Sequence, residues 1–128
     1  MFGHQSLDAE LKVLAEKYGP PAGRTLLVKR GDEVLAAGAI RDLGEGICEL
    51  KRLYVRDAAK GMGVGRRLSE ALMTAARDDG FTVVRLDTGN LLVEATRMYE
   101  SLGFTRRSPY LDYPERLLPY LVFMERQL

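Results

Sequence analysis

The stretch CELKRLYVRDAAKGMGVGRRLSEALMTAARDDG, residues 48–80, decides the fold of this chain. Its first part, ELKRLYV (49–55), has the apolar and aromatic content of a β-strand. From Leu68 onward, apolar residues recur three and four positions apart, which predicts an amphipathic helix. Gly80 stands where a helix end favours a residue that accepts a positive φ angle. The stretch therefore predicts a strand, a glycine-rich turn and a helix, in that order.

The turn between this strand and helix is KGMGVGRR, residues 60–67. Its three glycines stand at alternate positions, and without Cβ atoms they let the backbone approach a ligand closely. The N–H groups at a helix start lack partners within the helix, and the helix dipole adds positive potential there. Lys60, Arg66 and Arg67 contribute further positive charge. The turn therefore predicts a binding site for a phosphate or pyrophosphate group.

The spacing of the glycines separates this turn from two other phosphate-binding motifs. A Rossmann fingerprint begun at Gly61 needs glycine at the position of Arg66, and no Gly-Lys-Ser/Thr follows the turn as in a P-loop. The segment instead resembles motif A of the GNAT superfamily of N-acetyltransferases, (Arg/Gln)-x-x-Gly-x-Gly/Ala, with Lys60 at the Arg or Gln position. The later segment ATRMYESLGF (95–104) is similar to the superfamily's A-x-x-x-Y-E-x-x-G-F element.

This resemblance implies that acetyl-CoA is the acetyl donor and that its pyrophosphate lies on the glycine-rich turn. It also implies that main-chain groups at the end of strand 49–55 bind the pantetheine amides and polarise the acetyl carbonyl. Most members carry an asparagine that reaches the pantetheine, but here Leu92 holds that position and Asn90 lies two residues earlier. The expected cofactor-binding residues are Leu53, Tyr54, Val55, Lys60, Gly61, Met62, Gly63, Val64, Gly65 and Arg66.

Two residues are candidates for proton transfer. Tyr99 is the candidate general acid, because its position matches the tyrosine that faces the cofactor sulfur in many relatives; the alternative is a packing residue on an apolar helix face. Glu49 is the candidate general base, because it lies on the strand whose far end binds the cofactor. The alternative for Glu49 is an ion pair with Lys51 or Arg52.

Two further residues fit structural and functional roles alike. Cys48 could accept an acyl group, although a free cysteine is more often a small buried hydrophobe. Asp87 closes a predicted strand and could lie in the cleft, cap a helix or form an ion pair. The sequence contains no Cys/His or Ser/His constellation, so we expect direct attack of an amine on the thioester rather than a covalent acyl-enzyme.

The remaining pattern predicts one α+β domain over residues 1–128. We expect a GNAT-like central sheet, mixed but mostly antiparallel, with one parallel strand pair flanked by helices and an N-terminus shortened relative to the superfamily. A right-handed crossover should make strands 49–55 and 81–89 parallel. The other expected elements are a helix over Ser6–Tyr18, a hairpin of Thr25–Arg30 and Glu33–Asp42, a helix over Leu91–Leu102, and two antiparallel strands near Phe104–Ser108 and Tyr120–Arg126.

The composition narrows the function classes. The formal net charge of +1 over 128 residues argues against a general nucleic-acid binder, and so against a toxin that acetylates aminoacyl-tRNA. No apolar run is long enough to span a membrane, and the N-terminus lacks a signal-peptide pattern. A single cysteine allows no internal disulfide, and the absence of a Cys/His cluster predicts no metal site. We therefore expect a cytoplasmic location.

The sequence thus predicts an N-acetyltransferase that moves the acetyl group of acetyl-CoA to a primary amine of a small molecule or peptide. The alternative is a non-catalytic acyl-CoA-binding regulatory domain. Besides the amine substrate, we expect a second copy of the chain as a candidate partner in a homodimer, and neither nucleic acid nor a membrane.

Overall fold

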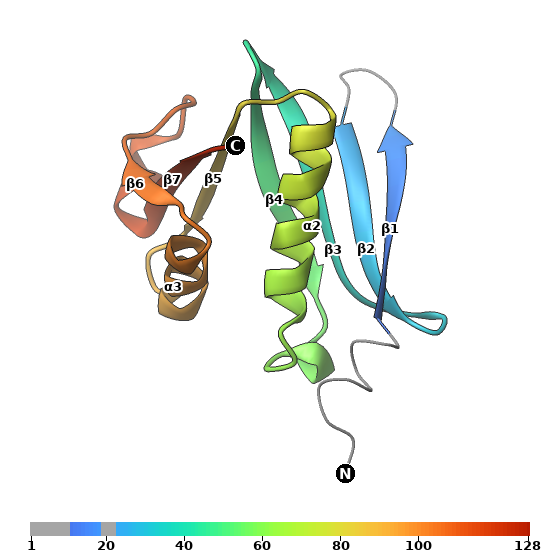
Figure 1. Cartoon of the computed structure of the whole chain (residues 1–128). Coiled ribbons are helices and arrows are strands. Elements are labelled where there is room, and N and C mark those ends of the chain that lie inside the picture. Colours follow the sequence, from blue (N-terminus) through green and yellow to red (C-terminus); the bar gives the residue numbers. More distant parts are fainter. Residues whose placement is uncertain (1–10, 19–22) are drawn as a thin grey trace.

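The computed structural model describes residues 11–18 and 23–128, which build one seven-stranded sheet with helices packed on it (Figure 1). The strand order across the sheet is β1-β2-β3-β4-β5-β7-β6. The elements are β1 (Leu11–Tyr18), β2 (Gly23–Arg30), β3 (Glu33–Gly44), β4 (Ile47–Val55), the 3₁₀ helix η1 (Asp57–Ala59), α2 (Val64–Asp78), β5 (Val83–Gly89), α3 (Val93–Ser101), β6 (Thr105–Arg107), the 3₁₀ helix η2 (Glu115–Tyr120) and β7 (Leu121–Gln127).

The first four strands form an antiparallel meander, as predicted for the hairpin of β2 and β3. The turn between those two strands is Gly31-Asp32, with Gly31 at a φ of 61°. The next turn, at 44–46, takes positive φ at all three residues, including Glu45 at 58°. These short turns place β2, β3 and β4 side by side and bring the chain to the centre of the sheet.

The predicted helix over Ser6–Tyr18 is wrong where the structure describes it. Residues 11–18 form the strand β1, which pairs with β2 along its whole length, from Leu11 opposite Arg30 to Tyr18 opposite Gly23. Residues 6–10 of the predicted helix lie outside the described residues. A short apolar segment can match both periodicities, and here pairing with the free edge of β2 decides between them. A strand, not a helix, therefore stands at the first edge of the sheet.

The strands β4 and β5 form the predicted parallel pair, but they pair over three residues only. Ile47–Glu49 lies opposite Val83–Arg85, and beyond these residues the two strands diverge. A bulge accompanies the divergence, because Gly38 of β3 pairs with Arg52 while its neighbour Ala37 pairs with Tyr54. Leu53 is thus one extra residue in β4, and such bulges bend a strand locally. The opening between β4 and β5 is called the splay below.

One face of the sheet carries the main core. Figure 1 shows α2 lying across β3 and β4, and the amphipathic pattern of its sequence places its apolar side on the sheet. The core joins α2, α3 and this face; its members include Leu26, Val28, Ile40, Leu50, Leu68, Leu72, Val84, Leu86, Tyr99 and Met124. Gly38 lies directly beneath the helix, since a Cβ there would be 2.8 Å from Leu72 Cδ1 and 3.0 Å from Lys51 O.

The predicted C-terminal strands are present, with β7 inserted between β5 and β6. Residues alternate between the two faces along β7. Met124 therefore joins the main core, while Phe123 is buried on the other face against the rings of Tyr110 and Tyr113. The described residues contain no helix with the length and apolar character to cross a membrane.

Cys48 is a core residue of β4 with no exposed surface. Burial raises the pKa of its thiol to about 12, and the negative charge of Asp42 acts in the same direction. A thiol with this pKa is a poor nucleophile, because the reactive species is the thiolate. This supports the structural interpretation of Cys48.

We predict that Gly38→Val will destabilise the protein by about 1–3 kcal/mol, the usual cost of overpacking a core. One of its close neighbours is a backbone oxygen, Lys51 O, which cannot move aside cheaply. Urea denaturation measures the free energy of unfolding. The control is Ala39→Val, next on the same strand but pointing to the opposite face; equal stability losses in the two variants would contradict the packing argument.

We also predict that Cys48 will resist iodoacetamide in the native protein at pH 8. With a pKa of about 12, only about one thiol in ten thousand is ionised at that pH. Mass spectrometry should find the native protein unmodified and the urea-unfolded protein fully alkylated. Rapid modification of the folded protein would show that Cys48 is accessible and reactive.

Candidate functional site

A cleft of about 780 Å³ opens between the end of β4, the glycine-rich turn and the start of α3. This volume lies in the usual range for a small-molecule site. Of the ten predicted cofactor-binding residues, eight line it: Tyr54, Val55, Lys60, Gly61, Gly63, Val64, Gly65 and Arg66. The structure adds lining residues that were not predicted, namely Arg52, Ala59, Leu91, Leu92, Val93, Glu94, Ala95 and Met98.

The glycine-rich turn has the geometry of an anion site. Gly63 caps α2 at a φ of 74°, and a Cβ added there would meet no atom within 4 Å, so the backbone faces open space. The first hydrogen bond of the helix runs from Arg67 N to Gly63 O at 3.1 Å. The amides of Val64, Gly65 and Arg66 therefore have no carbonyl one turn earlier within the helix. Such amides, with the helix dipole behind them, bind phosphate oxygens.

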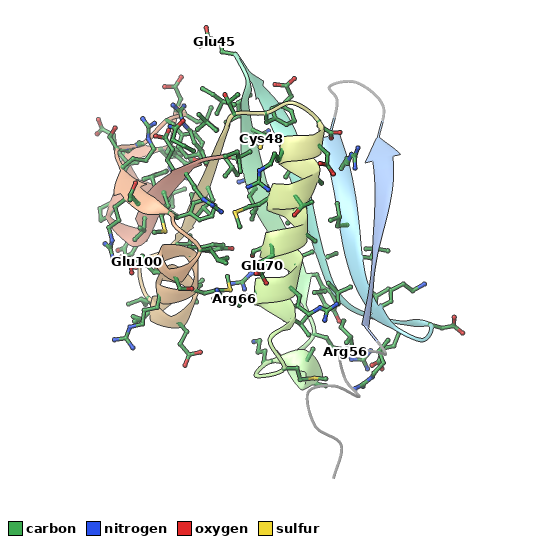
Figure 2. All side chains as sticks on the ribbon, in the orientation of Figure 1. Glu45, Cys48, Arg56, Arg66, Glu70 and Glu100 are labelled. Carbon is green, nitrogen blue, oxygen red and sulfur yellow. The ribbon has the colours of Figure 1, made fainter. Side chains whose placement is uncertain are left out.

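Three cations border this turn. The exposed Lys60 Nζ lies 2.9 Å from Asp57 Oδ1, and this hydrogen bond holds the pKa of Asp57 below its usual value. Arg66 extends from α2 toward α3, where its Nη1 donates to Ser101 Oγ at 2.7 Å (Figure 2). Arg52 Nη1 lies 2.9 Å from the place a Cβ would take on Gly65. Their charges favour an anionic ligand in the cleft.

The other two predicted cofactor-binding residues are Met62 and Leu53. Met62 packs against the main core. Leu53 is the bulged residue of β4, so its main chain is displaced from regular pairing with β3 beside the splay. That position suits the main-chain role that the resemblance to the GNAT superfamily implies for it.

An apolar wall at the start of α3 was missed by the sequence analysis. Leu91, Leu92 and Val93 are 86%, 53% and 52% exposed, which is unusual for three consecutive large apolar residues. Their lining of the cleft explains the exposure. Asn90 does not point to the cleft, because its Nδ2 donates to Pro119 O at 3.0 Å. The signal in the sequence was the apolar run LLV, which was instead assigned to the helix pattern.

Tyr99 is not among the residues that line the cleft and belongs to the main core. Its side chain is 3% exposed, and its ring packs edge-on against Phe104. Burial raises the pKa of the hydroxyl, while the charge of Arg52 and a hydrogen bond with Ser69 act in the opposite direction. A raised pKa keeps the hydroxyl protonated at neutral pH, as a proton donor requires.

Glu49 lies at the closed end of the splay, on the face opposite the main core. Its side chain has no exposed surface, and both oxygens have partners. Oε1 accepts from Arg41 Nε at 3.0 Å, and Oε2 accepts from the Tyr110 hydroxyl at 2.6 Å. Lys51 Nζ is 3.6 Å from Oε1. The predicted ion pair with Lys51 is therefore present, alongside two partners that the sequence did not identify.

Asp87 lies across the splay from Lys51. Its Oδ2 accepts from the Tyr113 hydroxyl at 2.8 Å and from Lys51 Nζ at 3.4 Å. Burial, and then the hydrogen bond to Asp87, raise the pKa of Tyr113 to about 12. Burial and the bond to Glu49 likewise raise the pKa of Tyr110. Both tyrosines therefore remain protonated donors to these carboxylates at neutral pH.

Within residues 11–18 and 23–128, no group of three or more His, Cys, Asp or Glu side chains gathers as metal ligands would. The polar groups around the cleft and the splay are instead amides, cations, hydroxyls and hydrogen-bonded carboxylates. This set suits recognition of phosphates and transfer of protons.

Comparison with known proteins points to one family. The profile of the Acetyltransferase (GNAT) family matches residues 2–104. An uncharacterised N-acetyltransferase of Schizosaccharomyces pombe is 35% identical over 127 residues, which cover 97% of this chain and 76% of that protein.

Two solved structures extend the comparison. A structure from Klebsiella pneumoniae, named as a candidate acyl-CoA N-acyltransferase, superposes with a TM-score of 0.76 at 30% identity, covering 87% of this chain and 76% of the other. A Bacillus subtilis acetyltransferase in complex with CoA shares the fold at a TM-score of 0.75 and 15% identity, covering 92% and 99% of the two chains. The chain is therefore an acyltransferase that belongs to the GNAT family of acetyltransferases.

Proposed function

We propose that this enzyme transfers the acetyl group of acetyl-CoA to a primary amine of a small molecule or peptide by direct attack. The observation that carries the proposal is the cleft of about 780 Å³ with the free end of α2 at one side and the splay at the other. The Bacillus subtilis neighbour holds CoA, which supports the same ligand here. Acetyl-CoA would supply the activated thioester carbonyl.

In this proposal, the glycine-rich turn binds the pyrophosphate. The amides of Val64, Gly65 and Arg66 donate to its oxygens, while Lys60 exchanges its contact with Asp57 for a phosphate contact. The apolar wall of α3 covers the uncharged arm of the ligand, which reduces the access of water to it. The displaced main chain at Leu53 offers donors and acceptors to the amide groups of that arm.

Two side chains would transfer protons in this reaction, one to the leaving thiolate and one from the attacking amine. Tyr99 would give its hydroxyl proton to the departing CoA thiolate, a role that its raised pKa permits. Glu49 would accept the proton of the attacking amine only through water, because its side chain has no exposed surface. An alkylamine has a pKa of about 10, so some group must accept this proton at neutral pH.

The experiment that tests the function combines calorimetry of acetyl-CoA binding with a panel of primary amines, followed by release of the CoA thiol. The proposal expects tight binding and amine-dependent thiol release. Binding without release for every amine would favour the alternative, a non-catalytic acyl-CoA-binding domain. Failure of acetyl-CoA to bind at all would overturn both.

We predict that Gly63→Val will weaken acetyl-CoA binding at least tenfold, about 1.4 kcal/mol. The new side chain would project into the space that the pyrophosphate occupies. The matched control is Gly31→Val, since Gly31 also has positive φ, 61°, and also faces open space, but lies in the β2–β3 turn. Both variants should lose stability alike, whereas calorimetry should find weaker binding for Gly63→Val alone. Equal affinity of the two variants for acetyl-CoA would refute pyrophosphate binding at the glycine-rich turn.

For Tyr99→Phe, we predict turnover about 10²-fold lower, the usual size of a general-acid contribution, with acetyl-CoA affinity and melting temperature nearly unchanged. The ring keeps its packing against Phe104, and only the hydroxyl is removed. Steady-state kinetics and a melting curve on the same sample measure both effects. Tyr120→Phe serves as the control, because that side chain is 63% exposed. Normal turnover in a well-folded Tyr99→Phe protein would exclude the hydroxyl from the reaction.

A further inference from the structure

The face of the splay opposite the main core holds an ammonium group between two carboxylates. In the register that pairs Glu49 with Arg85, the next residues on the same face are Lys51 of β4 and Asp87 of β5. Because the strands diverge, their side chains span the opening: Lys51 Nζ lies 3.4 Å from Asp87 Oδ2 and 3.6 Å from Glu49 Oε1. A primary amine of the chain itself therefore occupies the opening.

The two carboxylates differ in what an incoming molecule can touch. Glu49 is fully enclosed, and its oxygens are engaged by Arg41 and Tyr110. The Asp87 side chain is 20% exposed, and the Lys51 side chain 41%. Among the described residues, both contacts of Asp87, from Lys51 and from Tyr113, go to its Oδ2. Of the two carboxylates, Asp87 is thus the one that is partly exposed and whose Oδ1 can accept a hydrogen bond from a new donor.

We propose that Asp87 binds the protonated amine of the acceptor at the position that the Lys51 ammonium holds in this structure. The inference rests on the proposed function and makes it more specific. A primary ammonium carries three N–H donors on a single carbon substituent, as Lys51 does, so it can donate to Asp87 in the same way. The displaced Lys51 ammonium keeps its second partner, Glu49, which is 3.6 Å away. The buried carboxylate of Glu49 and the Lys51 ammonium therefore continue to compensate each other's charge.

Two neighbours fit this role of Asp87. The hydroxyl of Tyr113, from the loop between β6 and η2, donates to Asp87 Oδ2 at 2.8 Å. This bond fixes the carboxylate, so that Asp87 Oδ1 has a defined direction. Tyr113 in turn packs on Phe123, with ring centroids 4.9 Å apart, which anchors the loop to β7. The acceptor amine would thus meet the carboxylate of Asp87, which lies on a strand and is held in place by Tyr113. Asp87 is a specificity-determining residue in this proposal.

The test uses n-butylammonium chloride as the probe and equal concentrations of sodium chloride as the ionic-strength control. Titrations follow the side-chain carboxyl carbon signals of the aspartates and glutamates by NMR, without acetyl-CoA, in the wild type and three variants; Glu49, 3.6 Å from Lys51 Nζ, reports on the site where Asp87 is replaced. Asp87→Asn should raise the dissociation constant of n-butylammonium at least tenfold. Lys51→Met removes the internal competitor and should lower it at least threefold. Asp79→Asn is the matched control, because Asp79 is also part of an ion pair, at 2.6 Å from Arg24, and is 25% exposed. The Asp79→Asn variant should bind n-butylammonium with a dissociation constant within twofold of the wild-type value.

Three results would overturn the proposal: no saturable shift of the Asp87 signal in the wild type, unchanged binding in folded Asp87→Asn, or weaker binding in Lys51→Met. The last result would mean that Lys51 helps to bind the amine instead of competing with it. Calorimetry with acetyl-CoA on the same four proteins keeps the two proposals apart. If acetyl-CoA fails to bind, the proposed function fails, yet the amine titration still decides the role of Asp87.

Discussion

The incomplete pairing of β4 and β5 is the constraint on which the rest of the site depends. Two parallel strands that pair over three residues and then separate leave main-chain groups and side chains at an opening in the middle of a sheet. Such groups must find other partners or a ligand, because buried polar groups are costly without hydrogen bonds. On one face, the end of β4 beyond the last paired residue lines the cleft beside α2 and α3; on the other face, Lys51 and Asp87 bridge the opening. In the proposed function, the acetyl donor and the acceptor amine approach one point from opposite faces of the sheet.

The charged cluster around Glu49 maintains this arrangement. A fully buried carboxylate requires compensation, and Glu49 receives it from Arg41 on β3, Lys51 on β4 and the Tyr110 hydroxyl from the C-terminal loop. These partners come from three parts of the chain and meet at the last paired residue before the splay. The rings of Tyr110 and Tyr113 also pack on Phe123, which holds the loop between β6 and η2 against β7. Glu49 therefore connects the position of the splay to the side chains on the face of the sheet opposite the main core.

Local patterns predicted the glycine-rich turn, its helix and the parallel strand pair, but not the polar contacts of Glu49 and Asp87. The glycine-rich turn, α2 and the strand pair follow from residues close together in sequence, so spacing alone predicted a turn at 61–66 between a strand and a helix. The strand β1 was mistaken for a helix because its short apolar pattern fits both periods, and pairing with a distant edge decided the outcome. The partners of Glu49 and Asp87 lie 61 and 26 residues away, at Tyr110 and Tyr113. The periodicity of a strand does not indicate such contacts, and the loop between β6 and η2, which carries both tyrosines, has no regular pattern.

The most direct test of this account is the response of the backbone amides to CoA in a two-dimensional NMR titration. The account predicts that the largest shifts occur at the amides of 61–66 and 53–55, with smaller ones at the apolar wall of α3, residues 91–93. Residues 91–93 are far from the other two segments in sequence, yet they line the same cleft. Saturable shifts confined to another surface, with the amides of 61–66 unaffected, would contradict the claim that the free end of α2 and the splay form the acetyl-CoA site.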